Sequence, residues 1–237
     1  MKKKLIVLLM IILVVGSTGW LIYTGDYYHA DEVAQAALLS DEEVTVSKSD
    51  YGWYFDGPSE DQALIFYPGA KVETEAYAPF LHLLASEGMD VCLVDMPFRF
   101  AFLAINKADD VMTYHHYDDW YIGGHSLGGA MAAQYAASHE DQLTGVILCS
   151  AYPTKQLDQK LILLSLYGSE DKVVNRAMIE AGRKYAPDIY EEYVIQGGNH
   201  AQFGNYGRQK GDSEATITSS NQQQLAASFI IKNTVHH

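Results

Sequence analysis

Short apolar runs alternate with amphipathic segments along most of this chain, and this alternation predicts strands and helices in turn. Bounded runs of four to eight apolar residues are typical of buried strands, whereas longer segments with apolar residues three and four apart are typical of helices. The expected strands are residues 44–48, 52–57, 63–69, 91–97, 120–124, 143–150, 161–169 and 189–197. The expected helices are residues 75–88, 127–140, 172–186 and 220–232, and residues 98 to about 117 form a variable stretch.

Several of the expected strands are continuously apolar rather than alternating, as in "LILLSLYGS" at residues 161–169. Continuous apolar strands are required where helices cover both faces of a parallel sheet. The alternation of strand and helix therefore predicts a three-layer α/β sandwich with a mostly parallel central sheet.

The N-terminus differs from the rest of the chain. "MKKK" precedes a strictly apolar run from Leu5 to Val15, and the segment from Leu5 to Tyr23 has 19 residues, about 28 Å of helix at ~1.5 Å per residue. That length can cross the hydrocarbon core of a bilayer, and Trp20 and Tyr23 fall where interfacial aromatic residues gather. We expect an uncleaved signal anchor. A cleaved signal peptide is the alternative, with the small residues 16–19 as its cleavage region.

The predicted organisation has three parts. Residues 1–23 are the anchor or signal peptide, residues 24–42 a polar connector with a short helix, and residues 43–237 the folded domain. The domain is then expected outside the cytoplasm, held at the cell membrane or secreted if the leader is cleaved. No cysteine follows the apolar run, which excludes a lipid-modified anchor.

Composition adds two restrictions. The formal net charge is −14, and such an acidic surface repels phosphate backbones, so nucleic acid is excluded as a partner. Cys92 and Cys149 both lie in apolar strands and are expected to be buried thiols, with a disulfide between them as the alternative.

The sequence "GGHSLGG" places a serine in a crowded turn between an expected strand and an expected helix. Gly124, Ser126 and Gly128 complete the pattern G-x-S-x-G, whose required context is strand before and helix after. The glycines leave room for a strained turn that lifts the serine hydroxyl above the sheet. Ser126 is therefore the candidate nucleophile, and the alternative is a glycine-rich turn with an incidental serine. His125 is expected to point away from Ser126.

A serine hydroxyl needs a base, commonly a histidine held by a carboxylate. Asp171 follows the strong apolar strand at 161–169, and His200 lies in a glycine-rich loop after the last strand. These are the candidate acid and base. The alternatives are that Asp171 caps a helix, that the adjacent Glu170 is the acid, and that His200 is only a structural loop residue.

With these residues in view, the chain from about residue 44 to 232 resembles the α/β-hydrolase superfamily, in particular its compact, lid-less esterases and dienelactone-hydrolase-like members. The resemblance is carried by "YPGAKVE", "GGHSLGG", "YGSEDKVV" and "GGNHAQFG". It implies a Ser126–His200–Asp171 triad. It also implies an oxyanion hole made by the backbone amide of Leu127 and that of Ala70 or Lys71. Many members carry His-Gly where this chain has Pro-Gly, and the second donor is left open.

Only about ten residues separate the strand ending at 150 from the strand starting near 160, so no large cap is expected and the site should be open. Its wall is expected from residues 96–106 and 200–207. The predicted substrate-binding residues are Phe98, Phe100 and Phe203, with Phe102 beside them, and ordinary core packing is the alternative. Arg99 is either a contact for a substrate carboxylate or a solvated surface residue.

The chemistry expected from these residues is hydrolysis of an ester or related acyl bond through an acyl-enzyme. No cofactor is expected. No metal is expected either, because the pairs His115-His116 and Asp118-Asp119 point in different directions along one segment. The expected partners are a small-molecule acyl substrate and, through the N-terminal segment alone, the membrane. A thioesterase or peptidase would use the same triad, and a non-catalytic membrane-tethered binding protein is the alternative of another class.

Overall fold

The computed structural model describes residues 2–58 and 61–234. In these residues the strands form one eight-stranded sheet in the order β1-β2-β4-β3-β5-β6-β7-β8. The strands are β1 (Thr45–Ser49), β2 (Gly52–Asp56), β3 (Gln62–Tyr67), β4 (Asp90–Val94), β5 (Asp119–His125), β6 (Gly145–Cys149), β7 (Ile162–Gly168) and β8 (Ile189–Ile195). Only β2 pairs antiparallel with its neighbours β1 and β4; the remaining pairs are parallel. The predicted mostly parallel sheet is confirmed.

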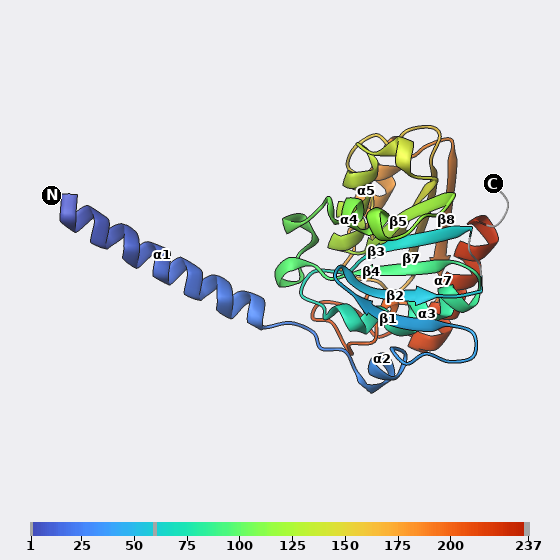
Figure 1. Cartoon of the computed structure of the whole chain (residues 1–237), viewed down its shortest axis with the longest axis horizontal. Coiled ribbons are helices and arrows are strands. Elements are labelled where there is room, and N and C mark those ends of the chain that lie inside the picture. The colour runs from blue at the N-terminus through green and yellow to red at the C-terminus, as the bar shows by residue number, and fades with distance from the viewer. Residues whose placement is uncertain (1, 59–60, 235–237) are drawn as a thin grey trace.

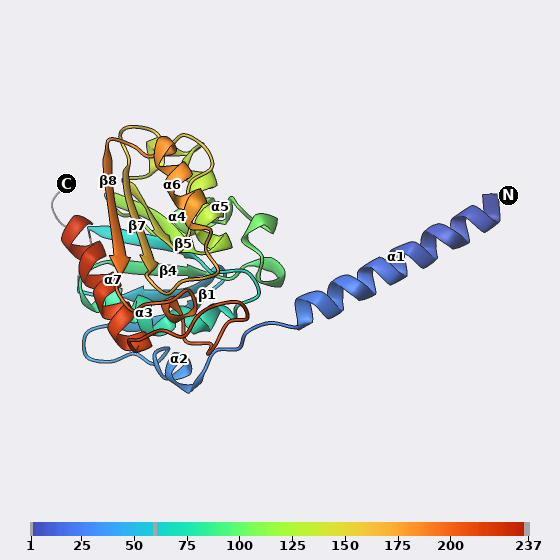
Figure 2. The ribbon, with the colours of Figure 1, turned by 180° about the vertical axis from the view of Figure 1, so that it is seen from behind.

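Helices cover both faces of this sheet (Figures 1 and 2). The helices are α1 (Lys2–Gly25), α2 (Glu32–Ala36), α3 (Ala78–Ser86), α4 (Lys107–Tyr114), α5 (Leu127–Ala136), α6 (Arg176–Gly182) and α7 (Ser219–Thr234). No large cap interrupts them within the described residues, and the three-layer α/β sandwich is confirmed.

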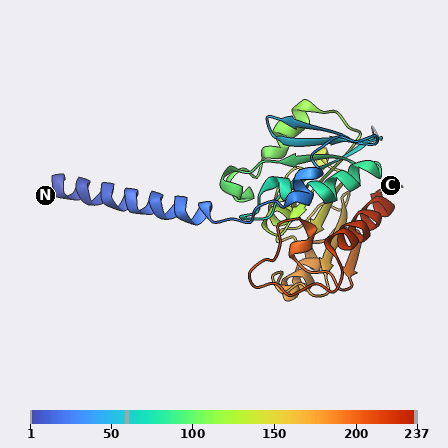
Figure 3. The same ribbon diagram turned by 90° about the horizontal axis from the view of Figure 1, so that it is seen from below.

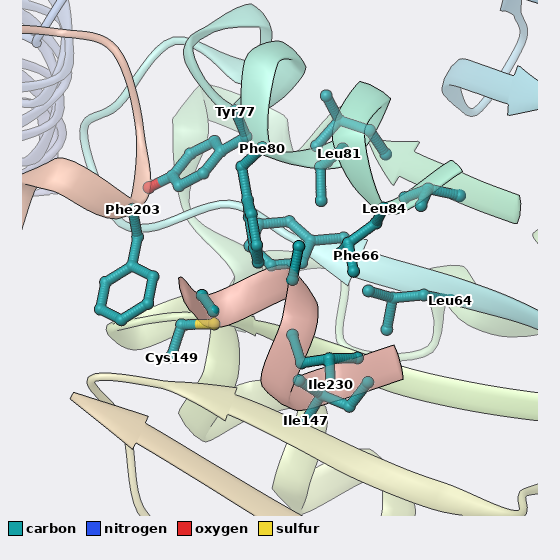
Figure 4. Packing of buried hydrophobic residues seen from close by; sticks show 14 of the residues in the cluster. Leu64, Phe66, Tyr77, Phe80, Leu81, Leu84, Ile147, Cys149, Phe203 and Ile230 are labelled. Carbon is teal, nitrogen blue, oxygen red and sulfur yellow. The ribbon is translucent and has the colours of Figure 1, made fainter. Parts of the chain in front are cut away.

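Strand β3 shows how the two layers of core are divided. Leu64 and Phe66 pack with α3 and α7 on one face, while Ala63, Ile65 and Tyr67 pack with α4 and α5 on the other. Every residue of β3 is buried, because successive side chains point to opposite faces and both faces are covered. Figure 4 shows the first of these clusters, with Phe66 close to Phe80 of α3.

The structure differs from the expected elements in two places. The helix expected at 172–186 begins only at Arg176. The side chain of Asn175 caps it by accepting a hydrogen bond from the backbone amide of Met178. The stretch 98–117, for which no element was expected, contains α4. Of the α4 side chains only Ala108 and Val111 are buried, so its apolar face is too narrow for a periodic signal.

Cys92 and Cys149 are both buried and free, as predicted, and they form no disulfide. In contrast with these core residues, α1 extends away from the domain, and its most apolar stretch has no buried residue, although Thr24 near its end is buried (Figures 1 and 3). Lys4–Gly25 is long and apolar enough to cross a membrane, a property that it shares with signal sequences.

Candidate active site

The candidate residues lie at one edge of the sheet. Ala70, Ser126, Asp171 and His200 follow strands β3, β5, β7 and β8, respectively. These strands are parallel, so their carboxyl ends meet at the same edge, where ligands of open α/β sheets bind.

Ser126 occupies the turn between β5 and α5 in a strained conformation. Its φ of 54° and ψ of −122° lie where a non-glycine residue is rarely found. A Cβ atom at Gly124 would stand 2.4 Å from the carbonyl oxygen of Tyr67, and one at Gly128 would stand 2.1 Å from the same atom. Only glycine at both positions lets α5 start this close to β3, which explains the spacing of the motif.

Asp171 and His200 are joined by a buried hydrogen bond. Nδ1 of His200 lies 2.9 Å from Oδ2 of Asp171, and each residue is 1% exposed. The other carboxylate oxygen of Asp171 accepts the amides of Val173 and Val174 at 2.8 and 2.9 Å. Burial by itself disfavours the charged carboxylate, but the hydrogen bond and charge of His200, together with the amide of Val174, act against burial, and the pKa of Asp171 lies below its ordinary value.

The rival acid Glu170 makes a different contact. Its carboxylate accepts a hydrogen bond from the hydroxyl of Ser169 at 3.0 Å, and His200 is bonded to Asp171 instead. Asp171 also stabilises the turn before α6 by accepting a hydrogen bond from the amide of Val173. The residue that caps α6 is Asn175.

Ser126 and His200 line the same open cavity of about 290 Å³. Its other walls come from the start of α5 and from the loops after β6 and β7: Leu127, Ala130, Ser150, Ala151, Tyr152, Val173, Val174 and Asn175. Nε2 of His200 is buried and has no hydrogen-bond partner among the described residues. Ser126 and His200 are therefore walls of one cavity, and no hydrogen bond joins them in the structure.

The backbone amides of Ala70 and Lys71, the two alternatives for the second oxyanion donor, have different surroundings. The amide of Lys71 donates to the carbonyl oxygen of Arg99 at 3.1 Å. No such bond engages the amide of Ala70 in the described part of the chain. Leu127 is the first residue of α5, where a backbone amide has no partner within the helix.

His125 lies beside this site, and the sequence analysis did not predict its contact with His200. Its ring lies 4.4 Å from that of His200, centroid to centroid, and its Nδ1 is 2.8 Å from the hydroxyl of Tyr77. That hydroxyl also accepts the amide of Gly69 at 3.0 Å, so its own proton can be donated to His125. Burial, with the charge of His200, lowers the pKa of His125 well below its ordinary value and keeps the ring neutral.

The phenylalanines predicted to bind substrate lie elsewhere. Phe203 is completely buried and packs against Phe80 and His125, so it belongs to the core (Figure 4). Phe98 and Phe100 pack on Trp20 of α1 and do not line the Ser126 cavity. The placement of all three on this cavity was wrong.

A local backbone feature explains this outcome for Phe98 and its neighbour. Phe98 and Arg99 have φ angles of 51° and 62°, a reversal that the residue pattern does not reveal. Arg99 stacks on Tyr27, with its guanidinium carbon 3.3 Å from the ring centroid. It therefore faces the connector rather than a substrate or open solvent.

No group of three or more His, Cys, Asp or Glu side chains is placed to hold a metal ion within residues 2–58 and 61–234. Nε2 of His115, from the segment weighed above as a metal site, is 2.8 Å from the hydroxyl of Tyr51.

Comparisons with known proteins agree with this fold. The family model described as "Alpha/beta hydrolase family" matches residues 63–224. A search of curated protein sequences finds no match.

Solved structures share the fold at low sequence identity. Est1E from Butyrivibrio proteoclasticus is 15% identical, with a TM-score of 0.57 over 82% of this chain and 100% of its own. A monoacylglycerol lipase from Paleococcus ferrophilus is 14% identical, with a TM-score of 0.59 over 81% of this chain and 100% of its own. A bacterial membrane phospholipase A is 13% identical, with a TM-score of 0.57 over 99% of this chain and 100% of its own. This last match extends over α1, since it leaves almost none of the chain uncovered.

Proposed function

Because the chain belongs to the α/β-hydrolase family, we propose that it is a serine hydrolase that cleaves an ester or a related acyl bond. The observation that carries the proposal is the buried Asp171–His200 hydrogen bond beside a serine in a strained turn at the start of a helix. The monoacylglycerol lipase among the fold neighbours is consistent with this chemistry.

In the proposed mechanism the hydroxyl of Ser126 attacks the acyl carbon and gives its proton to Nε2 of His200. Asp171 keeps the other imidazole proton on Nδ1, which leaves Nε2 free to accept. His200 then protonates the leaving group, and an acyl-enzyme on Ser126 remains. A water molecule that is deprotonated by His200 releases the acid.

The oxyanion that forms during attack is assigned to the amides of Leu127 and Ala70. The amide of Lys71 is already engaged by Arg99, which favours Ala70 as the second donor. Loss of one such donor costs on the order of 100- to 1000-fold in rate.

We also propose that α1 is a membrane anchor and that the domain lies outside the cytoplasm. The length and apolar composition of Lys4–Gly25 support this, as does the basic segment that precedes it. The fold match to a membrane phospholipase A over 99% of the chain is consistent with it.

The test is covalent labelling with a fluorophosphonate, together with turnover of short p-nitrophenyl esters. We expect the wild type to be labelled and to turn over, and Ser126→Ala to do neither. Ser150→Ala is the matched control, because Ser150 lines the same cavity. It should retain the label. Equal labelling of the wild type and Ser126→Ala would refute the proposed nucleophile, and a wild type with neither label nor turnover would indicate a binding protein.

A further inference from the structure

The end of α1 is held close to the active-site edge of the domain. Only Asp26 and Tyr27 lie between Gly25 and Tyr28, so α1 ends within about 11 Å of Tyr28 at ~3.5 Å per residue. The amide of Tyr28 donates to the carbonyl oxygen of Lys71 at 2.8 Å, and its carbonyl oxygen accepts the amide of Glu73 at 2.9 Å. The loop that receives these bonds follows β3 and includes Ala70.

Side chains at the junction fix the direction of α1 as well as its distance. The ammonium group of Lys71 lies 4.4 Å from the ring centroid of Tyr23 and 3.1 Å from the carboxylate of Asp26. Arg99, in the loop after β4, stacks on Tyr27 and donates to the carbonyl oxygen of Thr24 at 3.3 Å. Both loops belong to the carboxyl edge of the sheet, and that edge therefore faces the end of α1.

A segment after β4, the interfacial loop (Phe98–Leu103), lies beside the last turns of α1 (Figures 1 and 3). The ring centroids of Phe98 and Phe100 are 6.0 and 5.8 Å from that of Trp20. Trp20 stands about 24 Å along the helix from Lys4, in a bilayer core about 30 Å thick. If α1 spans the membrane, Trp20 lies near the boundary between acyl chains and headgroups. The interfacial loop, which contacts Trp20, then lies at the same boundary.

The interfacial loop also presents apolar side chains to the outside. Phe98, Phe102 and Leu103 are 50%, 45% and 44% exposed, although they are large and lie within six residues of one another. A cluster of exposed aromatic and aliphatic side chains beside a spanning helix is suited to a lipid interface.

We propose that the interfacial loop inserts into the outer leaflet of the membrane in which α1 is anchored, so that the domain has a second membrane contact. This contact would hold the carboxyl edge of the sheet, with the Ser126 cavity, at the lipid surface. The substrate class is then an acyl ester of that leaflet, and this part rests on the proposed function. Because the net charge is −14, neutral or zwitterionic lipids suit the surface better than anionic ones.

The membrane contact is tested without catalysis. The full chain carrying Phe102→Cys is labelled with a fluorophore and reconstituted in phosphatidylcholine vesicles that contain a lipid with a quencher near the headgroup. The native Cys92 and Cys149 are completely buried, so labelling selects the introduced thiol. Leu225→Cys is the control, since Leu225 is 40% exposed on α7, on the side of the domain away from α1 (Figures 1 and 2). We expect severalfold stronger quenching at position 102, and equal quenching would overturn the proposal.

The substrate class is tested by comparing two esters. In the double variant Phe102→Ser/Leu103→Ser, hydrolysis of phosphatidylcholine in vesicles should fall about tenfold or more, because two apolar contacts with lipid are lost. Turnover of a soluble p-nitrophenyl ester should stay within about twofold, since neither side chain lines the cavity. Leu225→Ser should change neither rate.

Unchanged vesicle hydrolysis in the double variant would overturn the assignment of a membrane substrate. A wild type that hydrolyses neither ester, with the quenching contrast intact, would refute the proposed function and leave the membrane contact standing.

Discussion

Replacing Asp171 by asparagine separates the role of its charge from its role in holding the loop. Oδ1 of Asp171 accepts two backbone amides, from Val173 and Val174, and only an oxygen can keep both bonds. The amide nitrogen of the new asparagine is therefore forced into the place of Oδ2, facing Nδ1 of His200 at about the present 2.9 Å. An N–H group there requires Nδ1 to be an acceptor, which moves the imidazole proton to Nε2.

An imidazole protonated on Nε2 cannot accept the proton of Ser126. In a serine triad this wrong tautomer lowers kcat by about 10⁴-fold, which corresponds to about 5.5 kcal/mol in activation free energy at ~1.36 kcal/mol per factor of ten. We expect a loss of that order for Asp171→Asn in the turnover of a p-nitrophenyl ester, with KM changed little. The fluorophosphonate labelling rate should fall in parallel.

Glu170→Gln is the matched control, because Glu170 is the adjacent acid and its carboxylate contacts Ser169 instead of His200. Its kcat should stay within about threefold of the wild type. Circular dichroism and thermal unfolding must show that both variants are folded. If Asp171→Asn kept more than a tenth of the activity while Glu170→Gln lost most of it, the assignment of the acid would be refuted.

Three further predictions concern folding. Gly128→Ala would place a Cβ atom 2.1 Å from the carbonyl oxygen of Tyr67 and should lower the free energy of unfolding in urea by about 1–3 kcal/mol. Tyr77→Phe leaves Nδ1 of His125 and a backbone amide without a partner, and it should lower the same free energy by about 1–3 kcal/mol. Burial raises the pKa of Asp90 above its ordinary value, so its contribution to stability is present below about pH 4 and is lost as pH rises through the pKa of the folded state. The unfolding free energy of the wild type should therefore decline relative to that of Asp90→Asn as pH rises above about 4.

Each of these three predictions has a control that isolates the physical cause of the expected change in stability. Gly182→Ala places its Cβ no closer than 3.1 Å to any neighbour and should cost less than Gly128→Ala. Tyr114 is 54% exposed, and Tyr114→Phe should change stability by no more than about 0.5 kcal/mol. Equal losses within either pair would contradict the proposed contacts. Parallel pH curves for the wild type and Asp90→Asn would show that the pKa of Asp90 is not raised by folding.

Much of the fold could be predicted from the sequence, because it depends on local sterics and on burial. The continuous apolar strands require a sheet covered on both faces, and the structure has one. Gly124 and Gly128 of the serine motif are spaced by a close approach of backbones, and both lie against the carbonyl oxygen of Tyr67. The order of strands likewise placed Ser126, Asp171 and His200 at one edge, because the carboxyl ends of parallel strands always meet there.

Contacts between segments far apart in the chain could not be predicted from the sequence. Phe98 and Phe100 were expected to line the site, but the chain turns through left-handed φ angles at Phe98 and Arg99, and both rings pack on Trp20, about eighty residues earlier in the chain. No sequence pattern marks that reversal, since non-glycine residues adopt it only where surrounding contacts hold them there. The α4 helix was missed for a related reason, because tertiary packing rather than a wide apolar face stabilises it.

The sequence by itself determined which residues are the candidates for the proposed chemistry and at which edge of the sheet they lie, because glycine spacing and apolar runs act through local sterics. Only the tertiary structure decided that the amide of Lys71 is engaged by Arg99, that His125 packs against His200, and that the end of α1 lies against loops at the carboxyl edge of the sheet. Those outcomes depend on hydrogen bonds and ring contacts between segments far apart in the chain, whose geometry is set by the packing of the whole domain.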